Sequence, residues 1–516
     1  MKKYFIFLFV AIGWVLSFFG CSEDKPSEET SALEENPKIV RQFVYDGMSL
    51  YYLWAPYMLD KKPPRLNIDP VDYFESLLYP IDRERGWSWI TDNVEELLSD
   101  FEGESNNAFG FSPTLLWADG TMTNLIAVIK YVYPDTPADE AGLKRGDIIT
   151  HINGEPITSS NYLTLFGSNT PVTFEVRDQF FENPRKISIT PRKISTDPVL
   201  YTHVYHYPEQ SKKIAYLFYT EFISNYNQSL YNAFAQFNRE GVTDLIVDLR
   251  YNPGGDISAA TYLGSLIAPR TEVVNKSVFT VLSYNPWLNT FFDEEGISRS
   301  DHLGVYREKV EPNPLDANLN LNNVYIIATN YTYSASELTT FCLRPYMNVV
   351  HVGDSTGGKY TASWTIHAYN TFPDKNGYNR VMTVYDESGL SEEEKFSLKN
   401  WAMQPIVAKY TDKNGIDFVD QGCLIPDYPV ASQENNPSAW VAIGDSTDYL
   451  LAKAISLITG QTIMRSLPLS TRSMPSIKMK DAGLSSPKEE RIRQSVNLDH
   501  IPFTPADLRK LRETKN

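Results

Sequence analysis

Residues 323–343 read NVYIIATNYTYSASELTTFCL, and this stretch decides the fold class. Its first part, NVYIIA, is a compact apolar run, which predicts a strand buried on both faces. A helical pattern follows from Ser334, where the S-x-x-E spacing from Ser334 to Glu337 is typical of a helix capping box. A buried strand that leads directly into a helix is the repeating unit of an α/β sheet. The stretch therefore predicts an α/β fold with Ser334 at a strand–helix junction.

The same pattern recurs on both sides of this stretch. Compact apolar runs at KIAYLFY, DLIVDLR and NVVHVGD predict further buried strands, and DISAATYLGSLI and STDYLLAKAISLI have helical spacing. We predict one α/β core domain over residues 196–460. The long segment 267–320 within it is expected to be an insertion or lid, because so long a connection is uncommon inside a compact domain.

Residues 105–195 have a different character, with short β-type runs and turns. The segment 138–154, ADEAGLKRGDIITHING, resembles the most recognisable stretch of a PDZ domain. In that family an extended peptide C-terminus adds a strand, and backbone N–H groups of a loop hold its carboxylate. The resemblance places this loop at Phe109, Gly110 and Phe111. The alternative is a module that only packs against its neighbour.

The N-terminus has the pattern of an export signal. Lys2 and Lys3 precede an apolar run, which ends at Gly20 and Cys21. This pattern predicts a secretory signal, and a small residue before a lone cysteine resembles the lipobox of bacterial lipoproteins. The resemblance implies lipidation of Cys21 and a lipid anchor in the outer or inner membrane of a bacterial cell envelope, with the protein facing the periplasm or the surface. A plain signal peptide or an N-terminal membrane anchor is the alternative.

The remaining segments complete the expected domain organisation. Residues 1–21 form the signal peptide, 22–36 a linker, 37–104 an N-terminal helical domain and 461–516 a flexible tail with a possible short helix after Thr504. The formal net charge of −17 makes nucleic acid an improbable partner, since an acidic protein repels phosphate backbones. Cys342 and Cys423 could form a disulfide, but we favour two free thiols.

Four serines near the strand–helix junction are candidate nucleophiles: Ser334, Ser336, Ser355 and Ser363. A serine hydroxyl needs a base. Ser355 lies in GDSTGG, which lacks the second half of the trypsin-like GDSGGP motif, and the G-x-S-x-G elbow of hydrolases is absent. His351 and His367 come with no recognisable triad motif. The remaining candidate base is Lys359, which follows two glycines after an expected strand.

Several motifs together resemble the C-terminal processing, or tail-specific, serine protease family. They are YSASE ending at Glu337, GDSTGGK ending at Lys359 and DLRYNPGG over 248–255, behind a PDZ module and a signal sequence. The resemblance implies a Clp protease/crotonase-like α/β core, a PDZ domain inserted in it or preceding it, and an N-terminal helical cap. It implies a Ser334 nucleophile and a Lys359 general base that act on polypeptides with accessible C-termini. No cofactor or metal is implied, and a homo-oligomer remains open.

The resemblance also suggests supporting roles. The backbone N–H groups of Ala335 and of Gly254 or Gly255 would bind the oxyanion. Arg250 and Asn252 would brace the loop.

The chain departs from the family at two positions. Ser363 stands where the family commonly has a glutamine that helps to hold the lysine, and Tyr360 replaces a usual glycine. Thr356 is therefore a further candidate for orienting Lys359. A non-catalytic PDZ scaffold and a carrier of hydrophobic ligands with the same fold are the rival functions.

Overall fold

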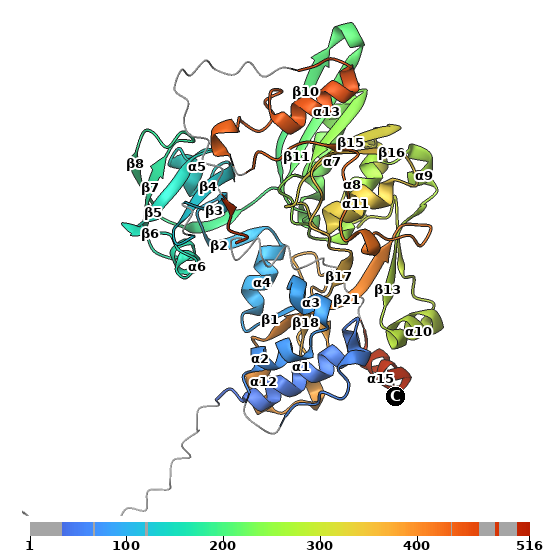
Figure 1. Ribbon diagram of the computed structural model, residues 1–516. Helices are drawn as coiled ribbons and strands as arrows, with labels where there is room; N and C mark the ends of the chain where they lie inside the picture. The colour runs from blue at the N-terminus through green and yellow to red at the C-terminus, as the bar shows by residue number, and fades with distance from the viewer. Residues whose placement is uncertain are drawn as a thin grey trace, which may run out of the picture.

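The computed structural model describes residues 34–64, 68–118, 122–434, 436–463, 480–484 and 503–515. Figure 1 shows three lobes: an α/β core, a β-rich lobe beside it, and a helical lobe below both. The predicted signal segment and its lipidation site, Cys21, lie outside the described residues. Among the helices of the described ranges, none combines the length and the apolar character that crossing a bilayer requires.

The core is built on a six-stranded sheet in the order β10-β11-β12-β15-β16-β22. Neighbouring strands from β11 to β22 are parallel, and β10 is antiparallel to β11. The strands are β10 (Val199–Tyr207), β11 (Lys212–Tyr219), β12 (Asp244–Asp248), β15 (Asn323–Ala328), β16 (Asn348–Gly353) and β22 (Tyr428–Pro429). This parallel arrangement confirms the α/β class that the repeated strand–helix pattern predicts.

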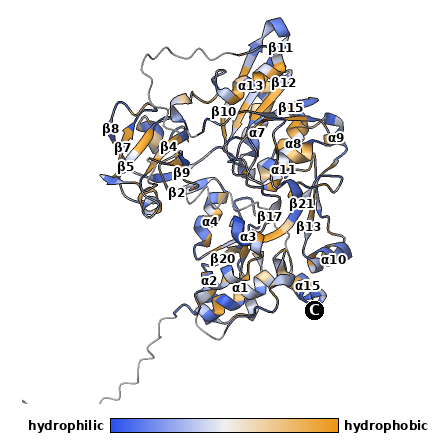
Figure 2. Ribbon diagram, in the orientation of Figure 1, coloured by the Kyte–Doolittle hydropathy of each residue, from blue (hydrophilic) through white to orange (hydrophobic). Residues whose placement is uncertain are grey.

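Helices cover both faces of this sheet. One apolar cluster contains Val324 and Ile326 of β15 and residues of α7, α8 and α11, and a second contains Ile327 and residues of α13. The alternation follows from the two-residue period of a strand, and it explains why the whole run NVYIIA is apolar. Figure 2 shows this hydrophobic colour along α8 and the neighbouring strands. The helices are α7 (Asn227–Glu240), α8 (Ile257–Ile267), α11 (Ala335–Leu343) and α13 (Tyr449–Thr459).

The β-rich lobe precedes the core in the chain and has a sheet in the order β23-β3-β4-β5-β7-β8. Two short helices accompany it, α5 (Pro137–Glu140) and α6 (Tyr162–Phe166). Strands β2 (Glu104–Ala108) and β9 (Arg192–Ser195) pair with each other where the chain enters and leaves the lobe. The other strands are β3 (Phe111–Trp117), β4 (Leu125–Val132), β5 (Ile148–Ile152), β7 (Val172–Arg177), β8 (Arg185–Ile189) and β23 (Lys480–Asp481).

The helical lobe is joined to the core by β-pairing. Its strand β1 (Trp89–Thr91) pairs with β20 (Ala402–Gln404), in a small sheet that also contains β18 (Ile366–His367) and β19 (Met382–Thr383). The lobe therefore shares a sheet with residues that follow the predicted nucleophile. Its helices are α1 (Pro37–Tyr51), α2 (Pro70–Leu77), α3 (Pro80–Arg85) and α4 (Val94–Phe101).

The expected insertion, 267–320, does not form a separate lid. Its strands β13 (Val278–Tyr284) and β14 (Ser300–His302) belong to a four-stranded sheet, β14-β13-β21-β17, in which β13 pairs with β21 (Ile406–Thr411). Phe279, Phe291 and Phe292 are fully buried. The segment is long because it supplies a strand pair and the helix α10 (Pro286–Glu295), which extend the core.

The tail from residue 461 was expected to be flexible with a short helix after Thr504, and two of its parts have regular secondary structure. Residues 480–481 form β23, and the helix expected after Thr504 is present as α15 (Pro505–Lys515). Leu508 and Leu511 on α15 are buried, and the Phe503 ring packs edge-on against that of Phe291, with ring centroids 5.3 Å apart. Two apolar side chains three positions apart suffice to dock a polar helix, a signal too short to stand out in the sequence.

Candidate active site

Ser334 occupies a strained position at the junction of β15 and α11. Its backbone dihedral angles are φ 67° and ψ −117°, a conformation that a non-glycine residue rarely adopts. Strain of this kind is kept only where the surrounding structure enforces it, and it is frequent at active sites. The Ser334 side chain is fully buried, and its hydroxyl has no hydrogen-bond partner among the described residues. A buried hydroxyl without a partner is costly, so this serine is a candidate for chemistry.

Glu337 links the loop of Ser334 to the loop of Lys359. Its Oε2 accepts hydrogen bonds from the backbone N–H of Ser334 and from that of Lys359, both at 2.8 Å. Its Oε1 accepts from the Gly358 N–H at 2.8 Å and from the Thr356 hydroxyl. Because one carboxylate oxygen binds both amides, the backbones of residues 334 and 359 are immediate neighbours. The S-x-x-E pattern in the sequence predicts the hydrogen bond from the Ser334 N–H to Glu337. It does not predict the three hydrogen bonds from Thr356, Gly358 and Lys359.

Tyr410 joins the same two residues through their carbonyl groups. Its buried hydroxyl donates to the Lys359 carbonyl at 2.8 Å and lies 3.4 Å from the Ser334 carbonyl. The tyrosine comes from β21, which pairs with β17 (Thr361–Ser363) directly after Lys359. Residues 334 and 359 are thus held from two sides, by Glu337, which the sequence indicates only as a helix cap, and by Tyr410, for which the sequence gives no signal.

Lys359 is fully buried, in surroundings that include a carboxylate of the helical lobe. Burial raises the pKa of Asp82, while hydrogen bonds from Ser88 and Tyr52 and the nearby charge of Lys359 act against this rise. Asp82 accepts from the Tyr52 hydroxyl at 2.7 Å and from the Ser88 N–H at 2.9 Å. In the sequence, Asp82 is an ordinary acidic residue in the first turn of a helix, α3. Only the fold shows that it lies near Lys359.

The resting arrangement does not join the two predicted catalytic groups. Since no described residue is hydrogen-bonded to the Ser334 hydroxyl, the Lys359 amine is not bonded to it in this structure. Catalytic hydrogen bonds are often long in ligand-free enzymes and tighten when substrate binds. A proton transfer between Ser334 and Lys359 would therefore require a side-chain movement, over a short path because their backbone amides share one Glu337 oxygen.

Gly254 packs directly against Ser334. A Cβ atom at Gly254 would lie 2.6 Å from the Ser334 Cβ and 2.7 Å from its hydroxyl oxygen, and its φ of 110° also favours glycine. The Gly254 N–H donates to the Asn252 side-chain oxygen at 2.9 Å. The amides of Gly255 and Ala335, by contrast, have no partner among the described residues. Of the predicted oxyanion donors, the geometry favours Ala335 and Gly255.

Gly254→Ala should therefore inactivate the site while the rest of the fold persists. The added methyl group cannot avoid Ser334 without moving the backbone, and the positive φ adds strain of about 1 kcal/mol or more. We expect reaction at Ser334 to fall at least about 100-fold, because displacement of a reacting group by about 1 Å costs that much. Gly389→Ala is the matched control, since nothing lies within 4 Å of its Cβ position. Equal labelling of both variants by a serine-reactive probe would contradict the proposed site.

Arg250 and Asn252 brace the loop before Gly254. Arg250 is buried and forms ion pairs at 2.7 Å with Asp248 and with Asp448, the N-cap of α13. Asn252 donates to the Tyr219 carbonyl at 3.0 Å. These contacts connect the loop to β12, β11 and the start of α13. The Ser336 hydroxyl, another of the candidate nucleophiles, donates to the Asn252 carbonyl at 3.2 Å and ties α11 to this loop.

Ser363 has a neighbour that the sequence could not reveal. Its hydroxyl accepts from the side-chain amide of Gln404 at 3.1 Å, and both residues are fully buried. Gln404 is on β20, so an amide reaches this position from a different strand than the family pattern predicts. Thr356, the other suggested orienting residue, donates to Glu337. Tyr360 stacks edge-on against Trp87 of the helical lobe, with ring centroids 5.3 Å apart.

The rejected candidates have other surroundings. His351 is buried on β16, and burial lowers its pKa to about 4. His367 lies 3.1 Å from the Lys399 carbonyl and accepts from backbone amides through its other nitrogen. These contacts hold His367 in its own small sheet. Cys342 and Cys423 are free thiols.

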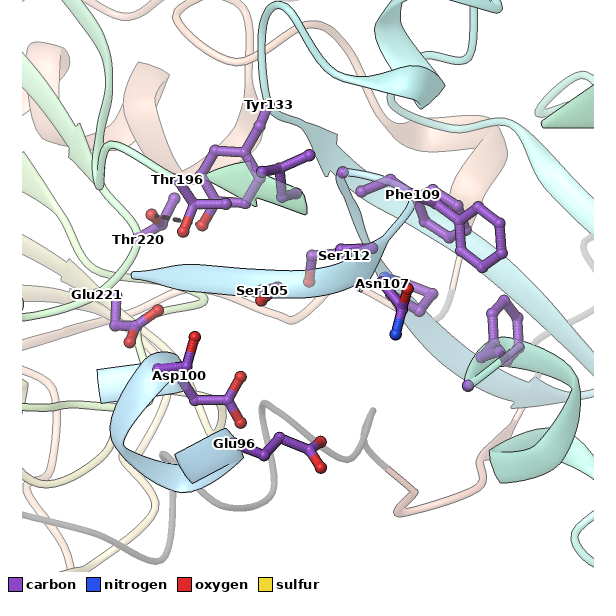
Figure 3. Close-up of a pocket in the computed structure, with 18 of the residues that line it drawn as sticks. Glu96, Asp100, Ser105, Asn107, Phe109, Ser112, Tyr133, Thr196, Thr220 and Glu221 are labelled. Carbon is purple, nitrogen blue, oxygen red and sulfur yellow. Dashed lines mark hydrogen bonds between the residues drawn. The ribbon is translucent and has the colours of Figure 1, made fainter. Parts of the chain in front are cut away.

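A cavity of about 510 Å³ lies between the β-rich lobe and the core (Figure 3). The predicted carboxylate loop, Phe109, Gly110 and Phe111, forms one end, with Phe166 of α6 beside it. Glu96 and Asp100 of α4 and Glu221 face it from the other side, as the labelled side chains show. Pro253, directly before Gly254, also lines the cavity. The cavity thus extends from the expected peptide groove to the loop beside Ser334.

Comparisons with known proteins match this arrangement. The model of Peptidase family S41 matches residues 213–430, that of the Peptidase S41 N-terminal domain matches 40–89, and that of the PDZ domain matches 128–164. The chain belongs to peptidase family S41, a family of C-terminal processing serine peptidases. Its core, PDZ domain and N-terminal domain follow the order that the sequence predicts.

Individual relatives are distant. A carboxyl-terminal-processing protease of Synechocystis is 26% identical over 232 residues, 43% of this chain and 47% of that protein. A chloroplastic C-terminal processing peptidase of Tetradesmus obliquus is 23% identical over 354 residues, 64% of this chain and 68% of that protein. The chain therefore spans about half to two thirds of the length of these relatives.

A crystal structure described as a putative S41 protease from Bacteroides fragilis has the same fold. It superposes with a TM-score of 0.60 at 24% identity, over 81% of this chain and 97% of that one.

Proposed function

We propose that this protein is a serine endopeptidase in which Ser334 attacks the peptide bond and Lys359 is the general base. The observation that carries the proposal is the shared carboxylate of Glu337, which holds the amides of both residues. The unpartnered, buried hydroxyl of Ser334 adds to it. Family membership supports the class of reaction, and these contacts support the choice of the two residues.

The proposed reaction begins with a neutral Lys359 amine. It takes the hydroxyl proton of Ser334 as the oxygen attacks the substrate carbonyl, and the Ala335 and Gly255 amides donate to the oxyanion. The resulting ammonium returns the proton to the leaving amine, and water then hydrolyses the acyl-enzyme. A lysine ordinarily titrates near 10.4, and burial shifts its pKa downward because the charged form loses its hydration.

The PDZ domain is proposed to select polypeptides with accessible C-termini. The 510 Å³ cavity supports this, since its lining extends from the loop at Phe109 to Pro253. A chain end held at the loop would thus lie in a cavity that leads toward Ser334. We further propose that Cys21 anchors the protein by lipid in a bacterial cell envelope.

A fluorophosphonate probe tests the assignment of Ser334. We expect covalent labelling of wild-type protein, with mass spectrometry placing the adduct on Ser334. No adduct is expected in Ser334→Ala, while Ser355→Ala, the matched control from the rejected motif, should be labelled like the wild type. A fluorophosphonate needs an activated hydroxyl, so a PDZ scaffold or a hydrophobic-ligand carrier would remain unlabelled. An adduct on another serine, or none, would refute the assignment.

A further inference from the structure

The outer edge of β3 is the peptide-binding edge of a PDZ domain, and part of it is already occupied. Strand β3 pairs with β4 on one side. On its other side lies β23, a segment of the chain's own tail (Figure 1). Exposed edges of this kind accept an added strand through main-chain hydrogen bonds. The occupant here comes from more than 300 positions later in the sequence.

The tail segment, residues 480–484, runs along β3 as an extended ligand would. It is antiparallel, with Lys480 opposite Trp117 and Asp481 opposite Leu116, and the Ala482 N–H donates to the Leu115 carbonyl at 3.0 Å. Its direction along β3 is therefore from Trp117 toward the loop at Phe109. A peptide that binds to a PDZ domain runs in this same direction, with its C-terminus toward the loop that holds the carboxylate.

Two side chains of the tail segment face the PDZ domain. Ala482 and Leu484, two positions apart, pack against its apolar core, and Gly483 between them is exposed. The remaining part of the same edge, from Phe109 to Pro113, borders the 510 Å³ cavity. The edge is thus divided between the tail segment and an open cavity.

The core domain also holds the tail segment. The Asp481 carboxylate accepts a hydrogen bond from the hydroxyl of Tyr331, which lies in the loop between β15 and Ser334. The same hydroxyl is 3.5 Å from that of Thr114 on β3. Tyr331 thereby clamps the segment from outside the PDZ domain.

We propose that residues 480–484 are a tethered ligand of the PDZ groove, which an incoming peptide with a free C-terminus displaces. The chain continues beyond Leu484, so the segment has no terminal carboxylate. A peptide with a free C-terminus can place its carboxylate at the loop of Phe109 and Gly110 and therefore gains a contact that the segment lacks. A tether provides an effective concentration on the order of millimolar. If the segment alone binds with a dissociation constant of about 0.1 mM, it weakens the apparent affinity of a competing peptide about 10-fold.

Peptide affinity measures this competition in the full chain. The background is Ser334→Ala, so that nothing is cleaved, and the probe is a fluorescein-labelled decapeptide ending in Lys-Asp-Ala-Gly-Leu with a free carboxylate. Ala482→Pro removes the N–H that binds Leu115, and we expect about 10-fold tighter binding. Tyr331→Phe removes the clamp without altering the segment, and we expect a smaller gain, of about threefold. Lys480→Gln is the matched control, with an exposed side chain on the same segment and unchanged affinity.

Hydrogen exchange gives a second readout that needs no substitution beyond Ser334→Ala. The Ala482 amide should be protected in the free protein and should lose protection when the decapeptide saturates the groove. Equal affinity in all chains, no binding in any of them, or continued protection of Ala482 with peptide bound would each overturn the proposal. The test does not depend on the chemistry at Ser334, which the fluorophosphonate experiment decides separately.

Discussion

Lys359→Met should lower kcat/KM for a quenched fluorescent peptide by about 10³-fold or more. The substitution keeps a flexible side chain of similar length and removes only the amine, so the Ser334 hydroxyl loses its base. The double variant with Ser334→Ala should be no slower than either single variant, because residues that act as one unit are not additive. The thermal unfolding midpoint should stay within a few degrees or rise, since a buried amine is removed.

Asp82→Asn reports on the charge state of Lys359 in the same assay. The Asp82 carboxylate lies within electrostatic reach of the lysine and favours its ammonium form. Its removal should shift the acidic limb of the pH–rate profile to lower pH, because the ammonium form of the lysine loses a favourable neighbour. Glu84→Gln, an exposed position on the same helix, is the control and should leave the profile unchanged.

Activity above one tenth of wild type in Lys359→Met would exclude Lys359 as the base.

Glu337→Gln should reduce kcat/KM by about 100-fold. The carboxylate accepts four hydrogen bonds that join the Ser334 and Lys359 loops, and an amide presents only one acceptor oxygen. At least one of the two loops is then released from its position, and a displacement of about 1 Å has an effect of this size. Glu394→Gln is the control, because Glu394 completes an exposed capping box on α12 (Glu392–Leu398).

The same variant has a pH signature in stability. Burial raises the pKa of Glu337 from 4.5 to about 7, so the folded protein retains a proton that the unfolded chain releases above pH 4.5. The stabilisation from this proton is complete below pH 4.5 and is lost as the pH rises to 7, by about 3 kcal/mol in total. Glutamine does not titrate. Relative to wild type, Glu337→Gln should therefore be least stable near pH 4.5 and recover toward pH 8 in thermal unfolding midpoints. A constant difference across this range would contradict the raised pKa.

The core architecture could be predicted because its signals are local. The apolar run at 323–328 alternates between two faces in the structure, yet it already indicates burial on both sides as sequence. The junction at Ser334 and the glycines at 254 and 255 are short motifs whose conformation depends on nearby residues. Burial, strand–helix alternation and glycine requirements are properties of a few consecutive positions.

The supporting residues could not be predicted, because their partners lie far away in the chain. The sequence around Glu337 predicts a helix cap, and no neighbouring residue in the sequence indicates its hydrogen bonds to residues 356–359. Gln404 comes from another strand than the expected glutamine, and Asp82 comes from another lobe. The tail segment 480–484 contains only two apolar side chains, which is too little for a sequence pattern to distinguish from a linker.

The sequence by itself thus determined the fold class, the order of the modules and the pair of residues proposed for catalysis. Only the tertiary structure decided what surrounds that pair and what occupies the PDZ groove. The physical reason is that backbone conformation and burial are encoded locally, whereas electrostatics and groove occupancy arise from side chains that folding brings together across hundreds of residues.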